Sequence, residues 1–276
     1  MTNLNESEAR SSIRPLFSEA GMAQLQATVQ PGMLCVFDFD GTLAPIVAQP
    51  DQARLPSDVR ERLLTLQQLT PVAILTGRAL ADIAARMEFE ADFMVGNHGL
   101  EGLPNSHQRR LGFEQECNAW RLQLEQAFAD HRRFDPGLLI EDKAISLSVH
   151  YRHVKDQLQA QEMLTQLFSS LTPPPRIIAG KCVFNLLPQA AGDKGTAFEE
   201  LMRLSRAPSA IYVGDDVTDE DVFRLKRSDL LSIRIGEDSD SSAQLTVPGY
   251  ADILPLLDAL ITRLASLKQQ RPLSQG

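Results

Sequence analysis

Short, uninterrupted apolar runs separated by helical patterns constrain the fold of this chain more than any other feature. The first run is Met33-Leu34-Cys35-Val36-Phe37, which is typical of a strand buried on both faces of a parallel sheet. Similar runs end at Leu75, Val95, Val213 and Ile235. The helical patterns between and after these runs cover Ser57 to Leu69, Ala79 to Met87, Lys194 to Leu204, Asp219 to Leu225 and Ile253 to Leu267. This alternation predicts an α/β fold with a doubly wound parallel sheet.

One segment, residues 103–187, breaks the alternation. A helical stretch from Phe113 to His131 is followed by Ala144 to Tyr151, where apolar and polar residues alternate as in a half-exposed strand. Another helix and two short strands follow, with a proline triplet at residues 173–175 that ends the helix. We therefore expect an inserted α+β domain with one open sheet face. The predicted division is an N-terminal extension at 1–30, a main domain at 31–102 and 188–268, and the inserted domain at 103–187.

The charge of the chain limits the classes of partner that it can bind. Its net charge is −9 at pH 7, and an acidic surface repels phosphate backbones and anionic lipid, so we expect neither nucleic acid nor a membrane as partner. An anionic small molecule would need a local cluster of cations. The three cysteines are far apart and form no zinc-binding pattern, and no apolar stretch reaches the length of a membrane span. We expect a cytoplasmic enzyme that is a monomer or a weak oligomer.

The segment Asp38-Phe39-Asp40-Gly41-Thr42 directly follows the first apolar run. Because side chains alternate along a strand, Asp38 and Asp40 project to one side beyond its carboxyl end, where open α/β sheets bind ligands. A carboxylate pair can hold a hard divalent cation, which lets Asp38 attack a phosphate group that would otherwise repel it. Asp40, when protonated, can donate to the leaving oxygen. The alternative is an aspartate-rich turn that only closes a strand.

Two further segments offer groups that could hold phosphate. Thr76, in Val72-Ala73-Ile74-Leu75-Thr76-Gly77-Arg78, can donate to a phosphoryl oxygen together with backbone amides at the start of the next helix, although a plain helix cap is the alternative. Lys194, in Gly192-Asp193-Lys194-Gly195, can neutralise both the nucleophile and the transferred group, although a solvated lysine is the alternative. The glycine spacing does not match a P-loop, so nucleotide hydrolysis is not indicated.

The last polar segment holds five acidic residues within the seven positions 215–221. Such acids repel one another unless a cation lies among them. We expect Asp215 to bind that cation directly. Asp216 and Asp219 are expected behind the ligands, where they orient water or Lys194. Thr218 and Asp221 could instead form a helix cap, and both interpretations can hold together.

In order and in role, these four segments resemble the motifs of the haloacid-dehalogenase superfamily over residues 33–267. The resemblance implies an aspartyl-phosphate mechanism, with Asp38 as the nucleophile and Asp40 as acid and then base. It implies that Thr76 and Lys194 hold the phosphate. It also implies a cap domain inserted between the threonine and lysine motifs, where the irregular segment lies.

The same resemblance implies Mg²⁺ as the cofactor. Its expected ligands are Asp38, the main-chain carbonyl of Asp40, and Asp215. The substrate class that it implies is a phosphorylated sugar.

Finer resemblance points to the trehalose-6-phosphate phosphatase family. Three segments carry it: Gly96-Asn97-His98-Gly99-Leu100-Glu101, Ile140-Glu141-Asp142-Lys143 with the strand after it, and Gly180-Lys181-Cys182-Val183. The final motif, Gly214 to Glu220, is also similar to that of the family. The substrate-binding residues that the resemblance implies are Gly77, Arg78, Asn97, His98, Glu141, Lys143, Lys181 and Asn185. Among them, Glu141 and Lys143 should reach from the cap to the sugar hydroxyls.

The chain departs from this family at one place. The family motif continues with a glutamate and a basic residue before proline, whereas this chain reads Phe184-Asn185-Leu186-Leu187-Pro188. Asn185 therefore stands at the position of a sugar-binding carboxylate and Leu187 at the position of a cation. An asparagine can still donate and accept hydrogen bonds, so a disaccharide phosphate such as trehalose 6-phosphate stays plausible.

Three alternatives remain from the sequence. The first is a phosphatase of the same mechanism that acts on another sugar phosphate, such as a glycosylglycerate phosphate. The second is a receiver-like phosphoacceptor switch, but such domains are shorter and carry no cap. The third is a catalytically silent carbohydrate-binding protein, against which the full set of acids and Lys194 argues. His150, Arg152 and Lys181 could also be ordinary polar residues on the solvent face of a small sheet.

Overall fold

The main sheet of the computed structural model, which describes residues 13–104 and 106–270, has seven parallel strands. Their order across the sheet is β1-β11-β10-β9-β2-β3-β4. The strands are β1 (Arg14–Pro15), β2 (Leu34–Phe37), β3 (Val72–Leu75), β4 (Phe93–Val95), β9 (Ala210–Gly214), β10 (Leu230–Ile235) and β11 (Leu245–Val247). The predicted parallel α/β sheet is confirmed, and β3, β4 and β10 end at the residues where the apolar runs end.

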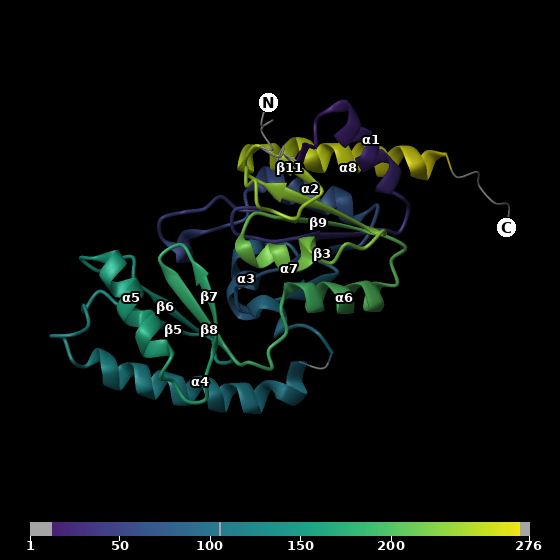
Figure 1. Ribbon diagram of the computed structural model, residues 1–276. Helices are drawn as coiled ribbons and strands as arrows, with labels where there is room; N and C mark the ends of the chain where they lie inside the picture. Colours follow the sequence, from purple (N-terminus) through teal and green to yellow (C-terminus); the bar gives the residue numbers. More distant parts are fainter. Residues whose placement is uncertain (1–12, 105, 271–276) are drawn as a thin grey trace, which may run out of the picture.

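Helices cover both faces of this sheet because its strands are apolar on both faces (Figure 1). Within β2, Cys35 and Phe37 pack on one face, and Leu34 and Val36 pack on the other. The first face is covered by α1 (Glu19–Thr28), α2 (Ser57–Gln67), α3 (Leu80–Met87) and α8 (Ile253–Gln269). The second face is covered by α6 (Lys194–Ser205) and α7 (Glu220–Phe223). The carboxyl ends of β2, β3 and β9 therefore lie between two buried layers.

A separate antiparallel sheet has the strand order β5-β6-β8-β7. Its strands are β5 (Leu139–Asp142), β6 (Leu147–His150), β7 (Arg176–Gly180) and β8 (Val183–Leu187). Two helices, α4 (Ser106–Phe128) and α5 (Gln157–Phe168), cover one face, where Trp120, Leu164 and Phe168 are buried against the strands (Figure 1). Strand β5 was not predicted, because it is an edge strand whose residues are mostly exposed and show weak alternation.

The other face of the small sheet is polar, as the alternation within residues 144–151 predicted. It does not look onto open solvent, however. Ser148 is 1% exposed, because this face is turned toward the carboxyl ends of β2, β3 and β9 across a cavity. The small sheet thus brings a second set of polar side chains to the ligand-binding edge of the main sheet.

Part of the expected N-terminal extension packs against the main domain. Strand β1 pairs with β11, and α1 lies beside α8 (Figure 1). Leu16, Leu25 and Val29 are buried in the same core cluster as residues of α8. The sequence signal is weak here, because β1 has two residues and the apolar positions of α1 are weakly periodic. The predicted domain boundaries stay a prediction. Within the described residues, no helix is long and apolar enough to cross a membrane.

An apolar cluster joins the two sheets. It consists of Leu100, Phe113, Ile145, Leu187 and Ala191, which come from the two connections between the sheets, from α4, from the end of β8 and from the turn between β5 and β6. This cluster fixes the small sheet beside the main one. It does so with apolar contacts, which are not directional.

Candidate active site

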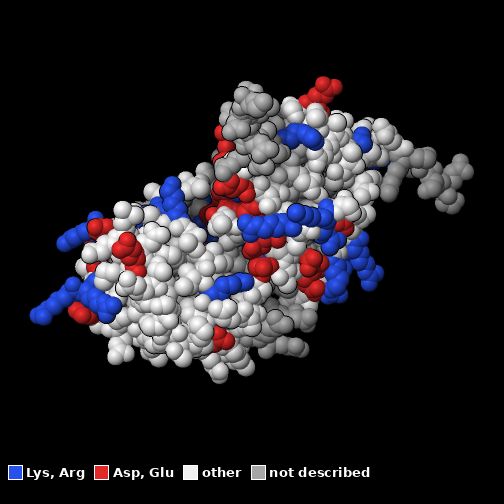
Figure 2. Space-filling view, viewed as in Figure 1, with Lys and Arg blue, Asp and Glu red and all other residues white. Residues whose placement is uncertain are grey.

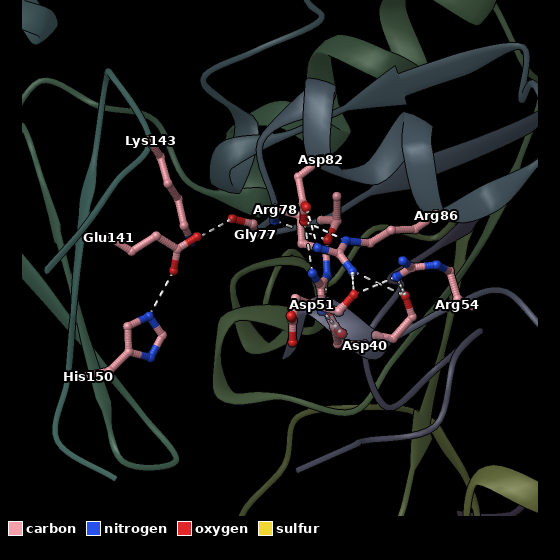
Figure 3. A network of polar contacts seen from close by, with 12 residues as sticks. Asp40, Asp51, Arg54, Gly77, Arg78, Asp82, Arg86, Glu141, Lys143 and His150 are labelled. Atoms are coloured by element: carbon pink, nitrogen blue, oxygen red, sulfur yellow. Dashed lines mark hydrogen bonds and ion pairs between the residues drawn. The ribbon is translucent and has the colours of Figure 1, made fainter. Parts of the chain in front are cut away.

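The predicted site residues meet in a cavity of about 290 Å³ between the two sheets. Asp38, Thr76 and Asp215 follow β2, β3 and β9, so that parallel strands deliver all three to one edge. Glu141 and Lys143 reach toward the same cavity from the small sheet (Figure 3). On the face seen in Figure 2, acidic side chains gather near α7 with lysines and arginines on both sides, so the local charge is mixed although the net charge is −9.

Lys194 lies between two buried carboxylates at the floor of this cavity. Its Nζ is 3.1 Å from Asp38 Oδ1 and 2.7 Å from Asp219 Oδ1, and all three residues are at most 5% exposed. Burial alone would lower the pKa of Lys194, but the charges of Asp219 and Asp38 outweigh it and raise that pKa. The lysine is therefore a fixed cation beside the predicted nucleophile.

Asp219 is fully occupied by hydrogen bonds from the protein. Its Oδ1 accepts from Lys194 and from the Tyr212 hydroxyl at 2.6 Å, and its Oδ2 accepts from the amides of Asp215 and Asp216 at 2.9 and 2.8 Å. This arrangement fits the predicted role of a carboxylate that orients its neighbours. The sequence did not indicate Tyr212, which lies inside an apolar strand and gives no separate polar signal.

Asp215 is held against the turn that follows β2. Thr42 Oγ1 donates to its Oδ1 at 3.1 Å, and Gly41 has φ +80° with Asp215 Oδ2 only 2.0 Å from where a Cβ would stand. A side chain at position 41 would displace the carboxylate, which explains the glycine in the motif. Burial, followed by repulsion from Asp219, raises the pKa of Asp215 to about 7.

The chemistry of these donors fits a divalent cation. Oxygens of Asp38, Asp215 and Asp219 lie within 4.8 Å of one another. Because the oxygens of Asp219 already accept four hydrogen bonds, Asp38 and Asp215 are the carboxylates that remain to bind a cation. Burial raises the pKa of Asp38 well above its usual range, Lys194 opposes this, and Asp219, Asp215 and Asp40 add to it. A cation would relieve that repulsion, and hard oxygen ligands suit Mg²⁺.

The side chain of Asp40 points away from this cluster toward Arg78. The guanidinium holds both carboxylate oxygens, with Nε to Oδ2 and Nη2 to Oδ1 each at 2.6 Å (Figure 3). Arg78 also donates to Asp82 at 2.8 Å and stacks over the Phe39 ring. Asp40 thus lines the cavity beside Asp38, with its carboxylate held by Arg78 and not turned toward the other carboxylates.

Thr76 and His98 form the wall of the cavity next to Asp38. Thr76 is 1% exposed, and its hydroxyl accepts from the Arg78 amide at 3.2 Å, as in the start of a helix. His98 packs over Gly77 so closely that a Cβ at position 77 would lie 2.5 Å from its ring. Burial, and then Lys143 and Lys194, lower the pKa of His98, so the imidazole is neutral. Among the described residues, none hydrogen-bonds to its buried Nδ1.

The small sheet contributes a row of polar residues. Glu141 pairs across strands with Ser148, and Ser148 pairs with Asn185 and donates to its Oδ1 at 2.6 Å. Glu141 Oε2 also lies 2.8 Å from His150 Nε2, a contact that lowers the pKa of Glu141 (Figure 3). Lys143 Nζ approaches the Gly77 carbonyl at 3.4 Å, and burial lowers the pKa of Lys143.

Most predicted site residues line this one cavity. Two are not among its lining residues, namely Asp219, which lies behind it, and Asn97, which is 0% exposed and contacts the turn that bears Lys143. Ser148, His150 and Arg152 also line the cavity. The sequence alternation placed the first two on one face of a strand, but it could not show what that face meets.

Comparison with known proteins identifies a family. The trehalose-phosphatase family model matches residues 36–249. Probable trehalose-phosphate phosphatase I of Arabidopsis thaliana is 27% identical over 270 residues, covering 90% of this chain and 71% of the relative. Trehalose-phosphate phosphatase of Mycobacterium tuberculosis is 32% identical over 239 residues, with 81% and 60% covered, so this chain spans less than two thirds of that relative.

A solved structure gives the same fold. The C-terminal domain of the Candida albicans trehalose-6-phosphate phosphatase aligns with a TM-score of 0.71 at 19% identity. The alignment covers 91% of this chain and 99% of that structure. At this identity the likeness concerns the fold, which includes both sheets.

Proposed function

We propose that this chain, which belongs to the trehalose-phosphatase family, hydrolyses trehalose 6-phosphate to trehalose and phosphate through an aspartyl-phosphate intermediate on Asp38. The observation that carries the proposal is the placement of Asp38 beside buried Lys194 and Asp215, under a sheet face that bears Glu141 and Lys143. The family supports a phosphatase. The cavity supports a phosphorylated sugar, since it joins cations to hydrogen-bonding groups.

Each residue has a separate role in the two chemical steps, which are formation of the aspartyl phosphate and its hydrolysis. Asp38 attacks phosphorus while Lys194 neutralises the charge that gathers on the nucleophile and the phosphoryl oxygens. Asp40 gives a proton to the departing sugar oxygen, and then takes one from the water that cleaves the aspartyl phosphate. Arg78 must loosen its grip on Asp40 for the carboxyl group to reach that oxygen. Thr76 and the amides after it hold the phosphoryl oxygens.

Mg²⁺ is the proposed cofactor, held by Asp38, Asp215 and the main-chain carbonyl of Asp40. The chemistry that bound Mg²⁺ supplies is charge neutralisation, which permits an anionic nucleophile to approach a phosphate dianion. Asp216 and Asp219 keep the ligands in place through the turn after β9.

A panel of sugar phosphates tests the substrate. We expect phosphate release from trehalose 6-phosphate to have a higher kcat/KM than release from glucose 6-phosphate, and excess chelator to abolish it until Mg²⁺ is restored. Activity that survives in chelator after metal-free dialysis would contradict the assignment of Asp38 and Asp215. Equal rates on the two phosphates would contradict trehalose 6-phosphate as the substrate, but they would not contradict the assignment as a phosphatase.

Asn185 favours a second candidate, a phosphatase for another sugar phosphate. Where the family has a carboxylate, this chain has an amide whose Oδ1 already accepts from Ser148. Lys181 and Arg152 also line the cavity nearby, so a substrate with an acidic group, such as a glycosylglycerate phosphate, belongs in the same panel.

The proposal also includes the location and the assembly of the enzyme. It is a monomer or weak oligomer in the cytoplasm, where its free thiols Cys35, Cys117 and Cys182 would stay reduced.

A further inference from the structure

We propose that Asn97 is a positioning residue, which holds the turn between β5 and β6 so that Lys143 reaches the sugar phosphate without Asn97 itself touching it. This inference rests on the proposed function, because it concerns the residue that presents Lys143 to that substrate. Its basis is a set of contacts in which the side chain of Asn97 bonds to the turn of the small sheet, while its backbone bonds to the phosphate side of the cavity.

The side chain of Asn97 contacts only the small sheet's turn among the hydrogen bonds of the described residues. Its Oδ1 accepts from the Ser146 hydroxyl at 2.5 Å, and its Nδ2 lies 3.5 Å from the Lys143 carbonyl. Asn97 is 0% exposed and Ser146 is 2% exposed, so water cannot replace these bonds easily. An amide suits this place because it can donate to one group and accept from the other.

The backbone of Asn97 is fixed to the phosphate side of the cavity. Its amide donates to the Arg78 carbonyl at 2.7 Å, and the next amide, of His98, donates to the Thr76 carbonyl at 3.0 Å. Both residues adopt left-handed backbone angles, with φ +52° and +57°. Consecutive residues of this kind are uncommon outside glycine, and asparagine tolerates the conformation best among larger residues. The turn is thus held in a costly shape that aims the Asn97 side chain at the small sheet.

Main-chain hydrogen bonds connect the residues of the turn that receives this side chain. The Lys143 amide donates to the Ser146 carbonyl at 3.0 Å, and the Ile145 amide donates to the Lys143 carbonyl at 2.9 Å. A shift of Ser146 would therefore carry Lys143 away from Gly77, whose carbonyl lies 3.4 Å from Lys143 Nζ. The apolar contacts of Ile145 hold the turn against the main domain but leave its orientation free, because such contacts are not directional. The Asn97 bonds supply the orientation.

A double-mutant cycle between Asn97 and Lys143 tests the inference. Asn97→Gly removes the amide without straining the left-handed backbone, which a substitution to alanine would do. Lys143→Ala removes the ammonium. On the best sugar phosphate of the panel, we expect each single change to lower kcat/KM by roughly tenfold, with Asn97→Gly acting mainly through KM. The double variant should lose no more than Lys143→Ala alone.

The control is Lys226→Gly. Lys226 is exposed, has a left-handed backbone with φ +46° and does not line the cavity, so this variant should keep wild-type kinetics. Ser146→Ala removes the same bond from the other side, so it should show the same non-additivity and it serves if Asn97→Gly does not fold. Phenyl phosphate has no sugar for Lys143 to bind, so Asn97→Gly and Ser146→Ala should lower kcat/KM clearly less on phenyl phosphate than on the sugar phosphate.

Additive losses, near a hundredfold in the double variant, would overturn the inference. Equal losses on phenyl phosphate and on the sugar phosphate would also overturn it, since Asn97 would then act on Thr76 and Arg78 instead. The inference would fail as well if Lys143→Ala had no effect on kcat/KM. The proposed function fails by a different result. It fails if trehalose 6-phosphate is not preferred in the panel, and the cycle can still be read on whichever sugar phosphate is preferred.

Discussion

Lys194 is stable as a buried cation only because two carboxylates share it. Removal of one partner from a buried ion pair typically costs about 3–5 kcal/mol, since the other charge is left without compensation. Replacement of Lys194 would leave Asp38 and Asp219 facing each other, so a loss of activity there would mix stability with chemistry. The roles in the mechanism are better separated at Asp38 and Asp40, where an asparagine keeps the shape of the side chain.

We predict that Asp38→Asn abolishes formation of a phosphoenzyme, because it removes the nucleophile. Asp40→Asn should lower kcat on the sugar phosphate by about 10²–10⁴, since protonation of the leaving oxygen and activation of water are both lost. With p-nitrophenyl phosphate, whose leaving group needs no proton, Asp40→Asn should accumulate aspartyl phosphate. Mapping of the trapped phosphate to any residue other than Asp38 would refute the mechanism.

The raised pKa of Asp215 predicts a pH dependence of metal binding. Its ordinary value is 3.8 and its value in the folded protein is about 7, so the metal-free folded state takes up a proton that the unfolded chain releases. Stability of the metal-free protein should therefore fall as pH rises from about 4 to about 7. Mg²⁺ competes with this proton, so the increase in Tm caused by Mg²⁺ should grow as pH rises through about 7.

Thermal unfolding with Mg²⁺ and with chelator, at a series of pH values, measures this dependence. Asp215→Asn is the control, because it removes this proton and should weaken both effects, and the dependence that is left comes from Asp38, whose pKa is also raised. A Tm shift by Mg²⁺ that is the same at about pH 5.5 and about pH 8.5 would contradict the competition between Mg²⁺ and a proton on Asp215.

Among the elements, apolar strands were easier to predict than edge strands and termini. Strands such as β2 are buried on both faces, so burial alone fixes their composition, and their runs are plain in the sequence. Strand β11 is three residues long and β5 is an exposed edge, so their local patterns are weak. From the sequence, strand β1 and helix α1 were predicted to lie outside the main domain. Their apolar residues could be recognised as core residues only from their packing with α8 and their pairing with β11.

Helix α1 offers a test of whether the N-terminal elements belong to the main core. Leu25 is 0% exposed within that core, so Leu25→Ala should lower the free energy of unfolding by about 2–5 kcal/mol. Gln26→Ala, on the exposed side of the same helix, should change it by less than about 0.5 kcal/mol. Urea unfolding of both variants measures the difference. Equal, small changes in the free energy of unfolding for both variants would mean that α1 does not belong to the main core.

For the whole molecule, the sequence predicted which residues line the site better than it predicted the contacts between them. Motifs after β2, β3 and β9 converge because parallel strands end at one edge, which the order of elements already implies. The sequence could not reveal that Arg78 holds Asp40, or that Asn97 lies behind the cavity, because these contacts join segments whose mutual orientation is set by packing. The polar face of the small sheet acquires its role in the same way.

In the proposed function, recognition of the sugar depends on both sheets at once, and Asn185 is the position that tests it. The phosphate end of a substrate would lie at Asp38, so its distal part meets the row Glu141, Ser148 and Asn185 on the facing sheet. A glutamate that accepts from a sugar hydroxyl makes a charge-assisted bond worth about 1.5–3 kcal/mol, whereas a neutral bond gives about 0.5–1.5 kcal/mol.

We therefore predict that Asn185→Glu preserves or raises kcat/KM for trehalose 6-phosphate, by roughly tenfold for each 1.4 kcal/mol regained. Asn185→Gln, which has the same length without the charge, is the matched control and should give no gain. Truncation of Glu141 or Lys143 should lower kcat/KM on the same substrate. If the site serves another sugar, Asn185→Glu will instead damage turnover of that sugar, and the wild-type enzyme will hydrolyse trehalose 6-phosphate no faster than glucose 6-phosphate. Steady-state kinetics of the wild-type protein, Asn185→Glu and Asn185→Gln distinguish these outcomes when they are measured on trehalose 6-phosphate, on glucose 6-phosphate and on the best sugar phosphate of the panel. The carboxylate can help only a substrate that presents a hydroxyl to β8.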